Sequence, residues 1–232
     1  TGKPKGVMAK HRGVINYSLP LEYNYHARTI ADKCSASLAI GSLAFDIAVA
    51  EIYPFLLTGK TVVLVDGDSS NDPAVLAEIM KKYSTDALLC TPSRLLRYIE
   101  YKPFADALKN FRSISAAGEA VPLSWLRKLR ELTDAKLYNG YGPTETTAGS
   151  VFLEMNDDYV NIGHPLSNEK VYIVDTEKNL LPVGAVGELC ITGYGVSAGY
   201  LNRPELTDER FIDVPYACGK MYCTGDLAKW NE

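Results

Sequence analysis

The stretch that decides the fold runs from residue 61 to residue 90 and reads TVVLVDGDSSNDPAVLAEIMKKYSTDALLC. Its two ends, Thr61–Val65 and Asp86–Cys90, are short apolar runs without polar alternation, as in strands that are buried on both faces. Between them, Asp72 stands as a helix N-cap directly before Pro73, a residue that favours the first helical position. A strand, a helix and a second strand in this order predict a parallel sheet with a helix packed on it. The apolar positions of that helix repeat at four-residue spacing: Val75, Ile79 and Tyr83.

The same alternation extends outward, from about residue 35 to residue 149. Further buried strands are predicted at Ser37–Ile40, Arg112–Ala117 and Ala135–Tyr138. Pro122 opens another predicted helix, whose apolar stripe consists of Leu126, Leu129 and Leu132. The predicted fold class is therefore α/β, with a parallel sheet flanked by helices.

The pattern changes after about residue 157. Strand-like runs at Lys170–Val174, Gly187–Thr192 and Lys220–Cys223 are separated by turn signals, with no good helix between them. This pattern predicts a small antiparallel, β-barrel-like unit. We expect residues 1–155 to form the α/β unit and residues 156–232 the β-barrel-like unit.

Composition narrows the class of protein. The chain has 24 Lys and Arg against 28 Asp and Glu, a formal net charge of −4, with 47% hydrophobic and 22% charged residues. These values are typical of a globular protein and disfavour a general nucleic-acid binder or a membrane-surface protein. We expect a cytoplasmic protein without nucleic-acid or membrane partners.

The five cysteines are scattered and include no C-x-x-C pair: Cys34, Cys90, Cys190, Cys218 and Cys223. Their odd number and spacing disfavour structural zinc and a disulfide framework. Buried, reduced thiols are the expected state.

The segment Asn139–Thr147, NGYGPTETT, follows a predicted strand that ends at Tyr138. In an open α/β sheet, ligands bind at the carboxyl ends of the strands. The segment combines an aromatic ring for stacking, hydroxyls for phosphate oxygens and a single carboxylate of the kind that holds Mg²⁺ with substrate phosphates. It is also compatible with a turn and a helix N-cap at Thr144, and the two interpretations do not exclude each other.

Three shorter segments carry weaker signals. TGKPKG at residues 1–6 is a glycine-bounded cationic loop suited to phosphate, although it is not the P-loop pattern. Asp226 ends a strand at a turn, where it could accept ribose hydroxyls or form an Asx turn. Asp46 precedes an apolar helical run, either as its N-cap or as a pocket carboxylate that needs a cationic partner.

Together these segments resemble the adenylate-forming, AMP-binding enzyme superfamily, and within it the amino-acid adenylation domains of nonribosomal peptide synthetases. The resemblance covers nearly the whole chain through TGKPKGVMAKHRGVIN, LAFDIAVAEIYPFLLTGKTVVLV, NGYGPTETT, GELCITGYGVSAGYLNRPELT and YCTGDLAKW. It implies that the chain contains part of the adenylation core. The family's region before the phosphate loop, and its C-terminal lid with a catalytic lysine, are absent. We therefore expect a fragment that is incomplete as a catalyst.

The resemblance also implies roles at the nucleotide. Lys3 and Lys5 match the loop over the ATP phosphates, and Thr144 matches the α-phosphate contact. Glu145 matches the Mg²⁺ ligand. The implied nucleotide-binding set is Gly118, Glu119, Asn139, Gly140, Tyr141, Gly142, Thr144 and Asp226. In it, Tyr141 stacks on adenine, Asn139 meets its amino group, and Asp226 holds the ribose.

For the amino acid, Asp46 matches the aspartate that pairs with the substrate ammonium. The implied pocket consists of Asp46, Ile47, Ala50, Leu89, Ser115, Ala117, Gly140, Ala148 and Gly149. Because Ala50 and the two glycines are small, we expect a deep cavity that suits a bulky uncharged side chain.

The implied reaction activates an amino acid with ATP and Mg²⁺ as aminoacyl-AMP and releases pyrophosphate. The acyl group then passes to the phosphopantetheine thiol of a peptidyl carrier domain, next to a condensation domain. Two alternatives stay open: an acyl- or aryl-CoA ligase of the same superfamily, and a non-catalytic excised subdomain. Asp46 favours an α-amino acid over a fatty or aryl acid.

Overall fold

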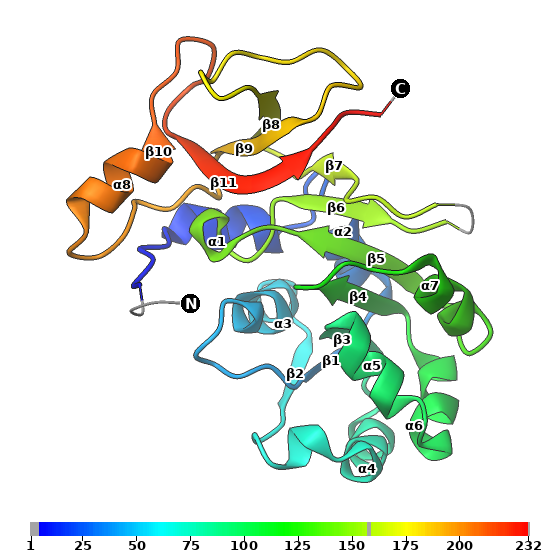
Figure 1. Cartoon of the computed structure of the whole chain (residues 1–232). Coiled ribbons are helices and arrows are strands. Elements are labelled where there is room, and N and C mark those ends of the chain that lie inside the picture. The colour runs from blue at the N-terminus through cyan, green and yellow to red at the C-terminus, as the bar shows by residue number, and fades with distance from the viewer. Residues whose placement is uncertain (1–4, 157–158, 232) are drawn as a thin grey trace.

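The structure is a computed structural model that describes residues 5–156 and 159–231. A seven-stranded sheet in the order β2-β1-β3-β4-β5-β6-β7 forms the larger part of the molecule (Figure 1). Its strands are β1 (Ala36–Ala39), β2 (Thr61–Leu64), β3 (Ala87–Cys90), β4 (Ser113–Ala117), β5 (Lys136–Tyr141), β6 (Val151–Glu154) and β7 (His164–Pro165). The first five are parallel, which confirms the predicted fold class.

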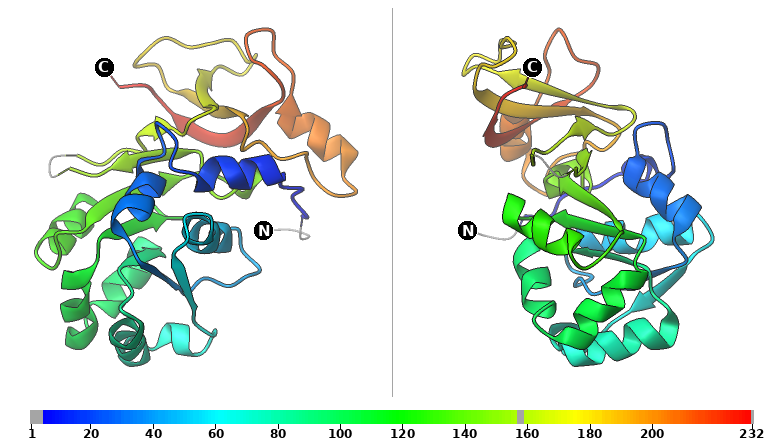
Figure 2. Two further views of the ribbon diagram at one scale, coloured as in Figure 1. Left: turned by 180° about the vertical axis from the view of Figure 1, so that it is seen from behind. Right: turned by 90° about the vertical axis from the view of Figure 1, so that its right-hand side faces the viewer.

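Helices cover both faces of this sheet (Figure 2). One face carries α4 (Pro73–Tyr83), α5 (Pro92–Tyr98), α6 (Lys102–Ala107) and α7 (Leu123–Arg130). The other carries α1 (His11–Ser18), α2 (Tyr25–Lys33) and α3 (Ile47–Leu56). The main core lies between the sheet and α4–α7, where fully buried side chains include Leu38, Leu95, Phe104, Ile114 and Trp125.

The helix predicted after Asp72 is confirmed as α4. The Asp72 side chain accepts a hydrogen bond from the Ala74 amide at 2.8 Å, and Pro73 is the first helical residue. The predicted stripe of Val75, Ile79 and Tyr83 is wrong, because the buried face of α4 consists of Leu76, Ala77 and Met80. The reason is the position of α4 beside the edge strand β2, which leaves the predicted stripe along a surface groove next to that strand.

Two features of the first sheet differ from the prediction. Strand β5 continues to Tyr141, three residues beyond the predicted end, because Asn139 and Gly140 pair with both β4 and β6 and Tyr141 pairs with β6. Strands β6 and β7 then extend the sheet in antiparallel order. Asn139, Gly140 and Tyr141 are therefore held inside the sheet, and the loop of the NGYGPTETT segment begins at Gly142.

The second sheet is antiparallel, in the order β10-β11-β9-β8, and lies across the end of the first (Figure 1). Its strands are β8 (Glu169–Val174), β9 (Gly187–Gly193), β10 (Phe211–Ile212) and β11 (Met221–Ala228). The expectation of no helix here is wrong, since α8 (Pro204–Arg210) begins with a proline, a residue that fits the first helical position. The first sheet extends to Pro165, so the strand pairing of the α/β unit continues past residue 155. Within the described ranges, no helix combines the length and the apolar character needed to cross a bilayer.

Candidate functional site

The junction of the two sheets brings together the aromatic residue of NGYGPTETT and the last carboxylate of the sequence analysis. Tyr141 ends β5 in the first sheet, and Asp226 lies on β11 in the second. The Tyr141 hydroxyl donates a hydrogen bond to Oδ2 of Asp226 at 2.6 Å. Burial, followed by this bond, raises the pKa of Tyr141, so the phenol stays protonated. Tyr141 is half-buried and Asp226 is exposed, which leaves both accessible to a ligand.

A second contact across the junction forms around Glu145, on the short turn Thr144–Thr146 that follows β5. The Glu145 side chain is largely buried, and its Oε1 atom accepts a hydrogen bond from the Tyr200 hydroxyl at 2.6 Å. The Lys5 ammonium lies 4.0 Å from the same oxygen and 4.9 Å from the centre of the Tyr200 ring. Burial, followed by the bond to Glu145, raises the pKa of Tyr200 to about 12. The Glu145 carboxylate, the Tyr200 phenol and the Lys5 ammonium therefore lie together at the junction of the two sheets.

Backbone pairing places Lys5 there. Val7 forms an antiparallel bridge with Tyr200, and the Met8 amide donates to the Gly199 carbonyl at 3.0 Å. The Leu201 amide donates to the carbonyl of Gly6 at 2.8 Å. The segment after the phosphate-loop motif is thus fixed to the second unit. Lys3 lies outside the described residues.

The remaining predicted nucleotide residues line the same end of the sheet. Asn139 is buried, and its Nδ2 atom donates to the Asn161 carbonyl at 2.7 Å. Gly118, at the end of β4, has a positive φ of 81°, which favours glycine. Glu119 is exposed, and hydrogen bonds from the Ser93 hydroxyl and amide lower the pKa of its carboxyl.

Thr144 and Gly142 belong to the loop between β5 and Glu145. Thr144 is exposed and is the first residue of the short turn. The N-cap position is Pro143, so the interpretation of Thr144 as a cap is wrong. A Cβ atom on Gly142 would come within 2.6 Å of the Gly149 backbone, so glycine is required for the loop to fold back.

Asp46 occupies the N-cap position of α3, yet it has helical backbone angles and its side chain makes no capping bond. Of the two alternatives for Asp46, the helix N-cap is therefore wrong. Tyr17 is buried and packs in one cluster with Ala50 of α3. Its burial, followed by the nearby negative charges of Asp46 and Glu51, raises the pKa of the Tyr17 phenol. Asp46 also lines an open cleft of about 860 Å³ together with Ile47, Leu89 and others. Asp46 therefore lines a cleft, and its pairing with a substrate ammonium stays a prediction.

The expected deep cavity opposite Ala50 is wrong, because aromatic rings occupy that space. A Cβ atom on Gly140 would lie 2.8 Å from the Phe152 ring, and one on Gly149 would lie 2.9 Å from the same ring. Ala50 itself is buried in a cluster with Phe152 and Tyr17. The glycines make room for Phe152, a residue of β6 that the sequence analysis did not consider.

The other predicted pocket residues surround this cluster. Leu89 and Ser115 lie on β3 and β4 and line a small cavity together with Ala50. Ala148 is half-buried, has a positive φ of 69° and packs against the Tyr17–Phe152 cluster. Ala117 ends β4 beside Gly140 on β5. The structure therefore brings these predicted pocket residues, and Asp46 and Ile47 in the cleft, to one region of the sheet.

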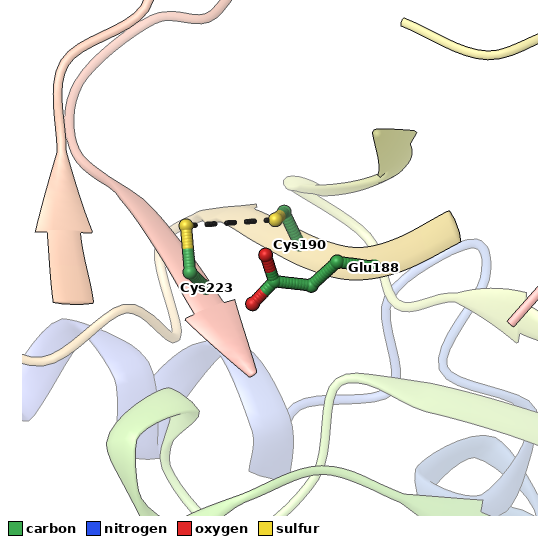
Figure 3. Close-up of side chains that lie close together, drawn as sticks. All are labelled: Glu188, Cys190 and Cys223. Atoms are coloured by element: carbon green, nitrogen blue, oxygen red, sulfur yellow. Dashed lines mark hydrogen bonds between the residues drawn. The ribbon is translucent and has the colours of Figure 1, made fainter. Parts of the chain in front are cut away.

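A separate cluster in the second sheet contains Glu188, Cys190 and Cys223 (Figure 3). The two sulfur atoms are 3.6 Å apart on paired strands, and contact with Cys223, then burial, raises the pKa of the Cys190 thiol. Both Glu188 oxygens already have partners, in an ion pair with Lys178 and a hydrogen bond from the Gly225 amide. The expectation of buried, reduced thiols is confirmed for four of the five cysteines, while Cys218 is exposed.

Two aromatic residues of the site escaped the sequence analysis. Tyr200 lies in the quoted segment GELCITGYGVSAGYLNRPELT, but no rule of spacing placed its hydroxyl on Glu145. Phe152 is one of six phenylalanines and belongs to a strand that was not predicted. The available signal was a pair of glycines at 140 and 149, which in a strand or loop can mark the close approach of another group.

Comparisons with known proteins agree with this geometry. The family model described as AMP-binding enzyme matches residues 1–201. Bacitracin synthase 3 of Bacillus licheniformis is 39% identical over 236 residues, which cover 99% of this chain and 4% of that protein. A solved four-domain nonribosomal peptide synthetase bound to AMP and glycine is similar with a TM-score of 0.86 and 31% identity, over 100% of this chain and 17% of that one.

Another solved structure contains adenylation and PCP domains bound to a vinylsulfonamide inhibitor. It is similar with a TM-score of 0.86 and 26% identity, over 100% of this chain and 40% of that one. The chain therefore spans less than half the length of each of these relatives.

Proposed function

Because this chain belongs to the family of AMP-binding enzymes, we propose that it supplies the ATP- and amino-acid-binding part of a nonribosomal peptide synthetase adenylation domain. In the proposed reaction, a carboxylate oxygen of the amino acid attacks the α-phosphorus of ATP. The bond to pyrophosphate breaks, and aminoacyl-AMP forms. A carrier-domain phosphopantetheine thiol then takes the aminoacyl group, and AMP leaves.

The observation that carries this proposal is the convergence of four segments at the junction of the two sheets. These are the segments of Lys5, of Tyr141 and Glu145, of Tyr200, and of Asp226. The Tyr141–Asp226 bond, the Tyr200–Glu145 bond and the Lys5–Glu145 ion pair join them. A cation, an aromatic ring and two carboxylates are the groups that a magnesium nucleotide requires.

The nucleoside would bind along the end of β5. The half-buried Tyr141 ring offers a surface for stacking, and the exposed Asp226 carboxylate can accept the two ribose hydroxyls. The amide nitrogen of Asn139 is engaged by Asn161, so its carbonyl oxygen is the group suited to accept from the adenine amino group. Gly118 and Glu119 form the neighbouring loop on β4.

Glu145 fits a magnesium ligand by its chemistry. It is a hard oxygen donor, and it already lies 4.0 Å from a cation, the Lys5 ammonium. When bound, Mg²⁺ would neutralise phosphate charge and orient the pyrophosphate leaving group. The chain's own contribution is to hold the carboxylate in place through Tyr200.

The phosphates need positioning and positive charge, and the reaction needs no nucleophilic side chain. We propose that Lys5, together with Lys3, supplies that charge and that the exposed Thr144 hydroxyl contacts the α-phosphate. Gly142 lets the loop approach closely enough for this contact. These roles make Thr144, Glu145 and the two lysines the catalytic group.

We propose that Asp46 pairs with the ammonium of the amino acid in the open cleft. The Asp46 side chain makes no capping hydrogen bond at the start of α3, which supports a role toward a ligand. Ile47, Ala50, Leu89, Ser115, Ala117, Ala148 and the glycines at 140 and 149 would then surround the substrate side chain. The partners proposed are a peptidyl carrier domain and a condensation domain of one cytoplasmic synthetase, without nucleic acid or membrane.

The proposed division of labour follows the two units expected from the sequence. Residues 1–155 would bind most of both substrates, and residues 156–232 would supply Asp226 and the Tyr200 contact. The structure of adenylation and PCP domains is the relative that supports a carrier partner.

The test is amino-acid-dependent exchange of pyrophosphate into ATP by the full-length protein that contains this chain. We expect exchange with at least one α-amino acid and none with its deamino analogue, the same carboxylic acid without the ammonium. Exchange with aryl or fatty acids instead would favour the acyl- or aryl-CoA ligase alternative. No exchange with any acid would support the non-catalytic alternative.

A further inference from the structure

A buried histidine without a hydrogen bond of good geometry lies beside the predicted substrate residues. His26, on α2, is 2% exposed, and neither of its ring nitrogens makes a hydrogen bond of good geometry, although the Tyr17 backbone lies close enough to be a weak partner. Burial lowers its pKa to about 3, an effect that the nearby Tyr17 backbone only partly offsets, so the ring is neutral. A buried polar group left unpaired costs roughly 1–3 kcal/mol, so an unpaired imidazole in a native interior calls for a partner.

The imidazole is fixed in place by aromatic neighbours. It stacks on Phe152 with ring centres 4.2 Å apart and planes inclined by 15°. The Tyr17 ring packs against the imidazole, with ring centres 4.8 Å apart and planes inclined by 45°. These contacts hold the ring in the interior, so a partner for its nitrogens has to enter the protein.

The space for such a partner is a small cavity, which we name the His26 niche. Polar side chains of His26, Ser37 and Ser115 line it, beside Ala50 and Leu89. Its volume of about 20 Å³ is sufficient for one water-sized atom. Three residues that the resemblance assigns to the substrate side chain, Ala50, Leu89 and Ser115, are among those that form its wall.

The niche lies next to the cleft that Asp46 lines. Leu89 and Glu51 line both spaces. Ala50 follows Asp46 by one helical turn on α3, so both lie on the same side of that helix. An amino acid whose ammonium meets Asp46 would therefore extend its side chain past Ala50 toward His26.

We propose that the His26 niche selects a compact, uncharged α-amino acid whose side chain carries a hydroxyl or amide group, with that polar atom hydrogen-bonded to the His26 imidazole. The inference rests on the proposed function and adds the class of substrate to it. Neutral imidazole has one donor and one acceptor nitrogen, so it can meet either group.

Size and charge follow from the surroundings. Phe152 and Tyr17 fill the space opposite Ala50, which excludes a bulky side chain. Among the described residues that line the niche there is no Lys or Arg to hold an acidic side chain. The Glu51 carboxylate accepts hydrogen bonds from the Ile40 and Gly41 amides, so it is already satisfied without a basic side chain.

Matched pairs of amino acids test the inference in the full-length protein by pyrophosphate exchange. Thr against Val, Ser against Ala, and Asn against Leu differ little in shape and mainly in the polar group. In the preferred pair we expect kcat/KM to favour the polar member by roughly 5- to 150-fold, the range that corresponds to 1–3 kcal/mol. An apolar member equal to or better than its polar partner in all three pairs would overturn the inference.

A variant identifies the group responsible. His26→Phe keeps an aromatic ring against Phe152 and removes both nitrogens. The kcat/KM for the polar amino acid should therefore fall to about the kcat/KM for its apolar partner. The control His11→Phe changes an exposed histidine at the start of α1 and should keep the preference. An unchanged preference in folded His26→Phe would also overturn the inference. If that variant does not fold, the wild-type pairs still decide.

The two levels of proposal fail differently. No exchange with any amino acid contradicts the proposed function. Exchange that is supported by apolar or bulky amino acids, with no polar preference, leaves the proposed function standing and contradicts the role of His26. A water molecule as the permanent occupant of the niche would give this second result.

Discussion

The proposed nucleotide end of the site and the proposed amino-acid pocket are built in different ways. At the nucleotide end, charged and polar groups from both sheets meet through hydrogen bonds, as in Tyr141–Asp226 and Tyr200–Glu145. In the pocket, the rings of Tyr17, His26 and Phe152 pack against one another in the interior of the first unit.

The difference shows that nucleotide binding depends mainly on the residue types present, whereas side-chain binding depends mainly on the shape of the pocket. A magnesium nucleotide is the same in every enzyme that uses it, so a few residue types in short segments can bind it. A side-chain pocket has to fit one substrate among many, and its shape depends on volumes contributed by several strands and helices. Substitutions in the two regions should therefore have different effects on activity, stability and substrate range.

The largest effect is expected at the nucleotide end. Glu145→Ala removes the proposed metal ligand and should lower pyrophosphate exchange by about a thousandfold or more, since metal neutralisation of phosphate charge is worth several kcal/mol. The measurement is kcat for exchange at saturating amino acid. Glu177→Ala, at an exposed glutamate, is the control, and exchange at the wild-type rate in Glu145→Ala would remove Glu145 from the mechanism.

The next effect concerns the pocket. Phe152→Ala removes a buried ring and should lower the free energy of unfolding by roughly 3–4 kcal/mol. It should also open the space in front of the glycines at 140 and 149, so larger amino acids become substrates. The measurements are denaturant unfolding and exchange with an amino-acid panel.

Phe104→Ala is the matched control, because Phe104 is fully buried on the other face of the sheet. It should lose comparable stability and keep the wild-type substrate range. A broadened range in both variants would mean that loosened packing, and not the position of Phe152, sets selectivity.

A pH dependence is expected from Glu51, which lies between the cleft and the His26 niche. Burial raises its pKa to about 7, from about 4.5 in the unfolded chain. The folded protein then holds a proton that the unfolded chain releases. The stabilisation by protonated Glu51 is full below about pH 4.5 and is lost as the pH rises through about 7. Glu51→Gln should reduce this slope of stability against pH, and an unchanged slope would contradict the shift.

The smallest effect is expected for the bond between the sheets. Tyr141→Phe keeps the ring for stacking and loses the hydroxyl that meets the exposed Asp226. The free energy of unfolding should fall by about 1 kcal/mol or less, and the KM for ATP should change by less than about threefold. Tyr194→Phe, at an exposed tyrosine, is the control. A large rise in the KM for ATP would show that the hydroxyl itself binds the nucleotide.

The sequence analysis named most of the residues that meet at the proposed nucleotide end, because these residues lie in a few short segments. Parallel strands such as β3 and β4 appear as unbroken apolar runs. Tyr141 is the last residue of another parallel strand, β5, and Glu145 follows it by four residues. Tyr200 could not be predicted, because its contact with Glu145 depends on the bridge between Val7 and Tyr200, which joins distant segments.

The pocket was predicted only in its outline. The resemblance placed Asp46 and Ala50 correctly on one helix, but small residues were interpreted as empty space. The volume at Gly140 is taken by Phe152, whose strand β6 is antiparallel and too short to stand out in the pattern. Whether a glycine leaves a cavity or admits a neighbouring side chain depends on contacts that spacing does not encode.

The central claim is that the two regions bind different halves of one reaction. The most direct test measures the KM for ATP and the KM for the amino acid in Asp46→Asn and Asp226→Asn of the full-length protein. We predict that Asp46→Asn raises only the amino-acid KM and Asp226→Asn only the ATP KM, each by roughly 10- to 100-fold, as for hydrogen bonds to charged groups. Equal rises of both constants in both variants would contradict the claim.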